Sequence, residues 1–240
     1  MKSNTVFLQS RATMFIPRFI GYTKANSDKY INLLDNAKAE ALEIPKNPFS
    51  PIPFNFEDSR PWQIISGSFR LVFLPNKIDL LLLNVHNDVS KQKEFLATAA
   101  KVFNEIAKRE DSHAVRLAYA PNMAFESIGD FCVDNFFAVN IPMSVYHECQ
   151  PKRATMKFEY QVPESICEHD MDINYIIKLS SGEKRVNREN QESSVSSIII
   201  AEVDINTKSQ DGLRLGENEV CDFFDKAIGY SDKFVDNFIH

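Results

Sequence analysis

The sequence predicts an α+β fold in which antiparallel strands are covered on one face by two long amphipathic helices. Several short segments alternate apolar and polar residues, which is the pattern of strands with one buried face. In residues 89–109 and 217–238 apolar residues recur every three or four positions, which is the pattern of helices with one apolar face. Strands followed by a helix laid across the sheet make an α+β arrangement.

Residues 62–125 are the unit around which we expect the chain to be organised, reading strand, turn, strand, helix, strand. Phe69 begins an alternating segment, and Pro75 ends it because proline has no N–H to donate. The nearly continuous apolar run of residues 78–85 predicts a central strand paired to it as a hairpin. Asp88 is positioned to cap the helix that follows.

The other expected elements follow from the same two periodicities. The alternation predicts three further strands in the C-terminal half. The last two are joined by residues 180–197, which we expect to form a long polar hairpin loop. Gly229 lies inside the last helix and predicts close packing there. The remaining expectations are a first strand over residues 5–20, a helix over 28–43 capped by Asn26 or Ser27, and strands over 155–162, 171–179 and 198–205.

Composition indicates one intracellular domain. The 240 residues are 44% hydrophobic and contain no flexible Gly/Ser linker, so we expect a single α+β domain over 1–240. The order of elements suggests two halves, 1–112 and 113–240, that repeat one strand–strand–strand–helix unit, although residue identities show no repeat. The four cysteines form no C-x-x-C pair, which favours reduced thiols in the cytoplasm.

The charge and hydropathy patterns argue against two classes of partner. A net charge of -6 leaves no concentrated basic face, so we expect no nucleic-acid partner. No run of about 18 apolar residues occurs, and the first residues do not form a signal peptide, so we expect no membrane partner.

Catalytic motifs do not stand out in the sequence. It has no G-x-S-x-G elbow, no phosphate-binding glycine loop and no G-x-G-x-x-G fingerprint. We therefore expect a protein that is not an enzyme, with no catalytic residues and no cofactor.

Two sets of residues are nevertheless compatible with metal chemistry. His147 and Cys149 form an H-x-C pair, and Cys167 with His169 forms the mirrored C-x-H pair, which together offer a tetrahedral zinc ligand set without the usual zinc spacings. The more ordinary interpretation is surface histidines and half-buried cysteines.

The second set consists of carboxylates on two predicted strands. Asp170, Asp172, Glu202 and Asp204 are the ligands that a metal-dependent, nuclease-like hydrolase would need if the strands brought them together. Each of them alternates with an apolar residue, which instead favours the solvent face of a half-buried sheet.

Residues 45–61 form a segment in which prolines are interleaved with large apolar side chains. Its apolar residues are candidates for partner binding, since proline keeps such a segment ordered without regular hydrogen bonds. The alternative, which we favour, is a strap over the protein's own core. The candidate contact residues are Phe49, Ile52, Phe54 and Phe56.

The order of segments resembles two known groups. Trp62 opening a hairpin, the helix after it, the strand beginning Arg116-Leu117-Ala118-Tyr119, and the terminal helix resemble a sporadically distributed bacterial family of about this length with no established function. The second half, strands then a long helix, also resembles the topology of SecB-like export chaperones, some relatives of which serve toxin–antitoxin or phage-defence modules. That resemblance implies a hydrophobic groove for unfolded clients and assembly through strand edges and helices.

Together these observations predict a non-catalytic protein- or peptide-binding protein, chaperone-like or associated with antiviral defence, that forms a homo-oligomer. The rival prediction is the metal-dependent hydrolase that would use the clustered carboxylates.

Overall fold

All strands in the described part of the chain belong to one antiparallel sheet. The computed structural model describes residues 5–34, 39–44, 60–126, 136, 155–167, 169–186, 194–210 and 212–238. Within these residues nine strands pair in the order β2-β3-β4-β5-β1-β6-β9-β8-β7. The strands are β1 (Thr5–Phe15), β2 (Glu40–Glu43), β3 (Trp62–Ser66), β4 (Phe69–Leu74), β5 (Lys77–Leu82), β6 (Arg116–Glu126), β7 (Thr155–Ile166), β8 (His169–Val186) and β9 (Ser194–Thr207).

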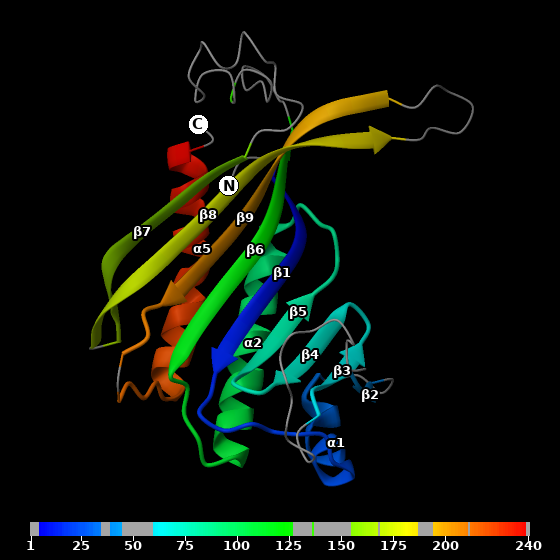
Figure 1. Cartoon of the computed structure of the whole chain (residues 1–240), viewed down its shortest axis with the longest axis vertical. Helices are drawn as coiled ribbons and strands as arrows, with labels where there is room; N and C mark the ends of the chain where they lie inside the picture. Colours follow the sequence, from blue (N-terminus) through cyan, green and yellow to red (C-terminus); the bar gives the residue numbers. More distant parts are fainter. Residues whose placement is uncertain are drawn as a thin grey trace.

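Two long helices cover one face of this sheet, which confirms the predicted α+β architecture. They are α2 (Val89–Arg109) and α5 (Glu217–Phe238), and a shorter helix, α1 (Lys24–Tyr30), continues into a 3-10 turn at Ile31–Leu34. Figure 1 shows α2 and α5 side by side behind the sheet, so neither of these helices covers its front face, which we call the open face. The two helices contact each other through Phe103 and Phe224, whose ring centroids are 5.7 Å apart.

The ends of these two helices lie where the sequence predicts them. Asp88 caps α2, accepting a hydrogen bond from the Ser90 N–H at 2.8 Å. Glu105 and Arg109 form the expected pair one turn apart, at 3.1 Å. The predicted hairpin is β4 and β5, which pair in register from Phe69–Leu82 to Leu74–Lys77.

The first strand joins the two halves of the sequence into one sheet. β1 pairs with β5 on one side and with β6 on the other. Residues of 1–112 and of 113–240 therefore share a continuous ladder of backbone hydrogen bonds at the β1–β6 boundary.

The predicted helix over residues 28–43 is wrong at both of its ends. The helix begins earlier, because the Thr23 side chain accepts from the Asn26 N–H at 3.0 Å and caps α1. Its continuation ends at Leu34, and Glu40–Glu43 instead pairs with β3 as an edge strand. Pairing with a neighbouring strand has overridden the helical pattern of these residues.

Three further expectations need correction. The strands of the β8–β9 hairpin extend into the predicted loop of residues 180–197, pairing from Gly182–Ile198 to Val186–Ser194. This arm projects past the rest of the sheet (Figure 1). The first strand ends at Phe15 rather than near Ile20. A Cβ added at Gly229 would meet no atom of the described residues within 4 Å, so among these residues that glycine does not mark close packing.

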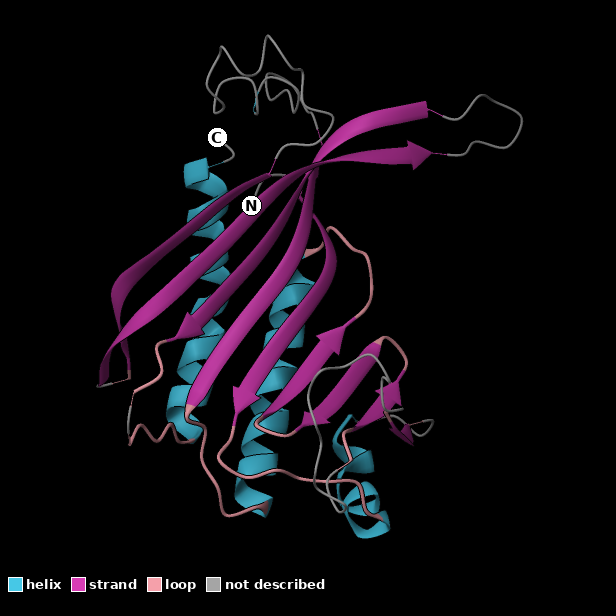
Figure 2. Ribbon diagram, in the orientation of Figure 1, coloured by secondary structure: helices cyan, strands magenta, loops and turns pink. Residues whose placement is uncertain are grey.

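The core lies between the sheet and the two long helices (Figure 2). Its largest fully buried side chains come from both layers and include Trp62, Tyr119 and Phe125 from the sheet and Phe95 and Phe223 from the helices. In the part of the chain that the structure describes, no helix combines the length and apolarity needed to cross a bilayer.

Candidate functional site

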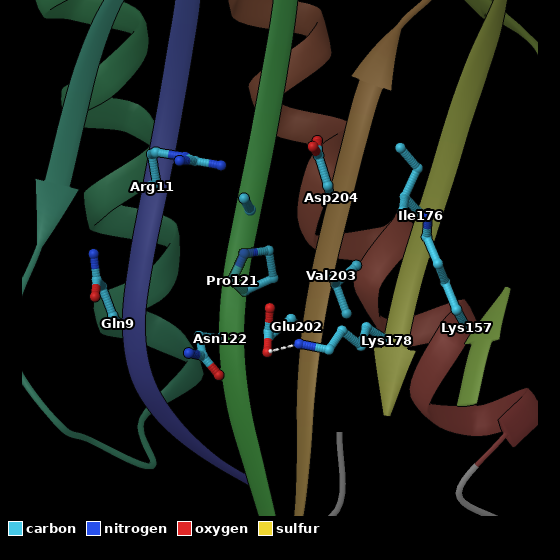
Figure 3. Close-up of a pocket in the computed structure, with 11 residues that line it drawn as sticks. Gln9, Arg11, Pro121, Asn122, Lys157, Ile176, Lys178, Glu202, Val203 and Asp204 are labelled. Carbon is cyan, nitrogen blue, oxygen red and sulfur yellow. Dashed lines mark hydrogen bonds and ion pairs between the residues drawn. The ribbon is translucent and has the colours of Figure 1, made fainter. Parts of the chain in front are cut away.

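The open face of the sheet carries a groove of about 340 Å³. It lies on the side that α2 and α5 do not cover, and it crosses five neighbouring strands, β1, β6, β9, β8 and β7. Figure 3 shows its side chains along these strands. The lining residues are Gln9, Arg11, Ala120, Pro121, Asn122, Lys157, Ile176, Lys178, Glu202, Val203 and Asp204.

Strand register arranges most of these side chains in two rows across the sheet. Residues that pair directly in adjacent strands point to the same face, so each row can be read from the pairing. One row consists of Gln9, Asn122, Glu202, Lys178 and Lys157.

The second row holds the residues that shape the groove. Arg11 pairs with Ala120, and Asp204 pairs with Ile176. Continuing the register of the flanking β6–β9 pairs places Asp204 opposite Ala120. Because Ala120 has only a methyl group, the groove is deepest in the middle of this row, between Arg11 and Asp204.

A proline interrupts the sheet beneath this part of the groove. Pairs between β6 and β9 are present at Tyr119–Ile205 and Asn122–Glu202 but absent between them in this fully described stretch. The Leu117 N–H donates to Thr207 Oγ1 on β9 at 3.0 Å, so the nitrogen of Pro121, four residues on, faces β9 as well. That nitrogen carries no hydrogen to donate, and the ladder therefore opens at the groove.

Most charges of the groove are balanced by a neighbour within the described residues. Glu202 binds Lys178 with an O–N distance of 2.8 Å, and Lys157 binds Glu159 at 2.5 Å. Asp204 Oδ1 accepts from the side-chain amide of Asn206 at 3.0 Å. The amide oxygen of Asn206 in turn accepts from Arg116 at 2.7 Å, so this network links Asp204 to a cation.

Arg11 is the exception among the described charges of the groove, since no carboxylate lies within 4.0 Å of it. Its two row neighbours are Leu81 and Ala120, neither of which can form an ion pair. The Nε atom of Arg11 is buried without a hydrogen-bond partner, and so is Oδ1 of Asn122. The two atoms lie in different rows of the sheet and are closed to solvent, so they are not themselves points of ligand contact.

The carboxylates predicted to bind a metal are dispersed. Asp172 binds Lys208 at 3.1 Å, and it lies four residues, about 13 Å along β8, from the position that pairs with Asp204. Asp170 pairs opposite a β7 serine, away from Glu202. Among the described residues no three His, Cys, Asp or Glu side chains are placed to hold one ion. All four acids lie on the open face, as the alternation of β8 and β9 predicts.

Only half of the predicted zinc set falls within the described residues. Cys167 is exposed in the tight turn between β7 and β8, where its φ of 52° is left-handed and its N–H donates to Asp222 Oδ2 at 2.6 Å. His169 Nε2 lies 3.5 Å from a carboxylate oxygen of Glu219. His147 and Cys149 lie outside the described residues, as do Phe49, Ile52, Phe54 and Phe56 of the proposed arm.

A buried polar contact on the helix-covered face is a second constellation worth testing as a site. The Gln92 amide on α2 donates to Ser10 Oγ at 2.5 Å and to the Tyr119 hydroxyl at 2.7 Å. Burial raises the pKa of Tyr119, which therefore stays neutral. All three side chains are at most 1% exposed, so this contact joins α2 to the sheet and is closed to ligands.

Sequence reasoning missed the residues that define the groove, above all Arg11, Asn122 and Ile176. The available signal was Pro121 in the middle of a predicted strand, preceded by two small residues, Ala118 and Ala120. It marks a gap in a sheet but does not say which strands border the gap.

Comparison with known proteins adds no relatives. No protein-family model matches the chain, and no curated protein is significantly similar to it in sequence. The resemblances to a bacterial family and to SecB-like chaperones therefore stay predictions.

Proposed function

We propose that this chain is a non-catalytic binding protein that holds an extended segment of a protein or peptide partner on the open face of its sheet. The observation that carries the proposal is the groove itself, in which Arg11 has no ion-pair partner among the described residues. A guanidinium gains free energy when a ligand supplies an acceptor for its exposed N–H groups.

The shape of the groove favours a peptide over a compact small molecule. It crosses five strands, and neighbouring strands are about 4.8 Å apart, so it spans about 19 Å. That length accommodates about six residues of extended chain at about 3.4 Å per residue. The alternating donors and acceptors of a peptide backbone also suit the mixed polar lining.

Charge pairing explains why we do not propose hydrolysis. Glu202 and Asp204 are the acids that line the groove, and the first is bound to Lys178 while the second accepts from Asn206. A metal would have to displace these partners with only two carboxylates available nearby. Self-association, location in the cytoplasm and a chaperone-like or defence role remain predictions that follow from the same function.

The test is a hexapeptide array probed with wild-type protein and with the Ala120→Trp variant. The indole would fill the hollow beside Arg11, so we expect loss of most of the peptide signal with little change in the thermal melting curve. Ala97→Trp is the matched control, because Ala97 is exposed on α2 away from the groove. Peptide binding that survives Ala120→Trp, or an absence of binding to any peptide, would contradict the proposal.

A further inference from the structure

The unbalanced cation of the groove indicates which peptides it would select. Lys178 is neutralised by Glu202 and Lys157 by Glu159, while Asp204 is linked through Asn206 to Arg116. Among the described groups that line the groove, Arg11 is thus the cation without an ion-pair partner within 4.0 Å, and the nearest acid in its row is Asp204, on the far side of Ala120. Its guanidinium extends from β1 toward β6 (Figure 3).

An acidic side chain is the group that best completes this arrangement. A carboxylate accepts hydrogen bonds from two guanidinium N–H groups at once, and such charged pairs are stronger than neutral ones.

We infer that the groove selects extended peptide segments that carry an Asp or Glu side chain, which Arg11 binds over Ala120. This inference rests on the proposed function and names the class of segment. The net charge of -6 opposes acidic ligands at long range, so any preference for them must arise from a local contact. The preference is therefore diagnostic of Arg11.

The experiment compares capped hexapeptides that differ only by Asp or Asn, at each position of the best array binder, by fluorescence anisotropy. With wild-type protein we expect the Asp form to bind about tenfold or more tightly at one position. Arg11→Gln should abolish that ratio, and Arg11→Lys should keep part of it, because lysine retains the charge without the paired donors.

Arg70→Gln is the matched control. Arg70 and Arg11 flank Leu81 in one cross-strand row, but Arg70 is exposed on β4 outside the groove, so its loss should leave the Asp preference unchanged. Binding without any preference for Asp, or a preference that persists in Arg11→Gln, would overturn the inference while leaving peptide binding intact. Absence of binding to every peptide would overturn the proposed function and the inference together.

Discussion

The two faces of the sheet are formed by alternate residues of the same strands, but they have different neighbours and different tasks. On β8, Ile177 points to the helices and is fully buried, while the adjacent Ile176 lines the groove and is half-buried. On the helix side the side chains are mostly apolar and buried, and the polar contact of Gln92 is buried with them. On the open side ion pairs and small side chains leave a hollow. We therefore expect substitutions on the two faces to separate stability from the proposed binding, residue by residue.

The largest expected effect comes from a substitution on the helix-covered face. Ile177→Ala should lower the free energy of unfolding by about 2–5 kcal/mol, because it removes buried contacts and leaves a cavity. Ile176→Ala should cost about 1 kcal/mol, because its side chain already contacts solvent. Chemical denaturation of both variants measures the difference, and equal losses would show that the two faces contribute alike.

Two ion pairs, one with a largely buried carboxylate on the helix side and one exposed on the open face, provide a second comparison. Glu110, at the end of α2, is 11% exposed and accepts from Tyr30 OH and from Lys29 Nζ, the latter at 2.5 Å. Glu110→Gln should cost about 1–2 kcal/mol at neutral pH, since a charged acceptor is lost. Glu202→Gln, in the exposed pair on the open face, should cost about 0.5 kcal/mol or less.

The pH dependence of Glu110 follows from its pKa. Burial alone raises the pKa of this carboxyl, but the hydrogen bonds from Lys29 and Tyr30 and the charges of Lys29 and Arg18 outweigh burial and hold it below the ordinary value. A depressed pKa stabilises the fold above the unfolded-state value of about 4.3 and loses this effect as the pH falls through the folded-state pKa. The gap between wild type and Glu110→Gln should therefore close only below about pH 4.3, and a gap that closed at neutral pH would contradict this assignment.

A comparison of two glycines tests the solvent side of the helix layer, where Gly229 lies. It is exposed inside α5, and an added Cβ would meet nothing, so Gly229→Ala should raise the free energy of unfolding by about 1 kcal/mol. At Gly182 a Cβ would lie 3.0 Å from Ile200 Cδ1, and Gly182→Ala should bring no such gain. Thermal melting of both variants tests this, and destabilisation by Gly229→Ala would indicate a neighbour on this side of α5.

The smallest expected effect on stability belongs to the groove. Arg11→Gln should change the free energy of unfolding by less than about 0.5 kcal/mol, because Arg11 has no ion-pair partner to lose. A loss of several kcal/mol would mean that Arg11 supports the fold rather than a ligand.

The elements that could be predicted well from the sequence are those that depend on local signals. Asp88 caps α2, and apolar spacing within α2 and α5 requires no knowledge of the rest of the chain. β2 was missed because residues 40–43 become a strand only by pairing with β3. The groove was missed for the same reason at longer range, since Arg11, Ala120 and Asp204 come from distant segments that only strand register brings into one row.

The most direct test of the central claim asks which face the partner touches. A photo-crosslinking residue placed at Gln9, exposed in the groove, is compared with one at Lys101, exposed on α2 on the opposite side of the molecule, using the best hexapeptide from the array. We predict crosslinking from position 9 that excess unlabelled peptide abolishes, with none from position 101. Crosslinking from position 101 and not from position 9 would contradict the account.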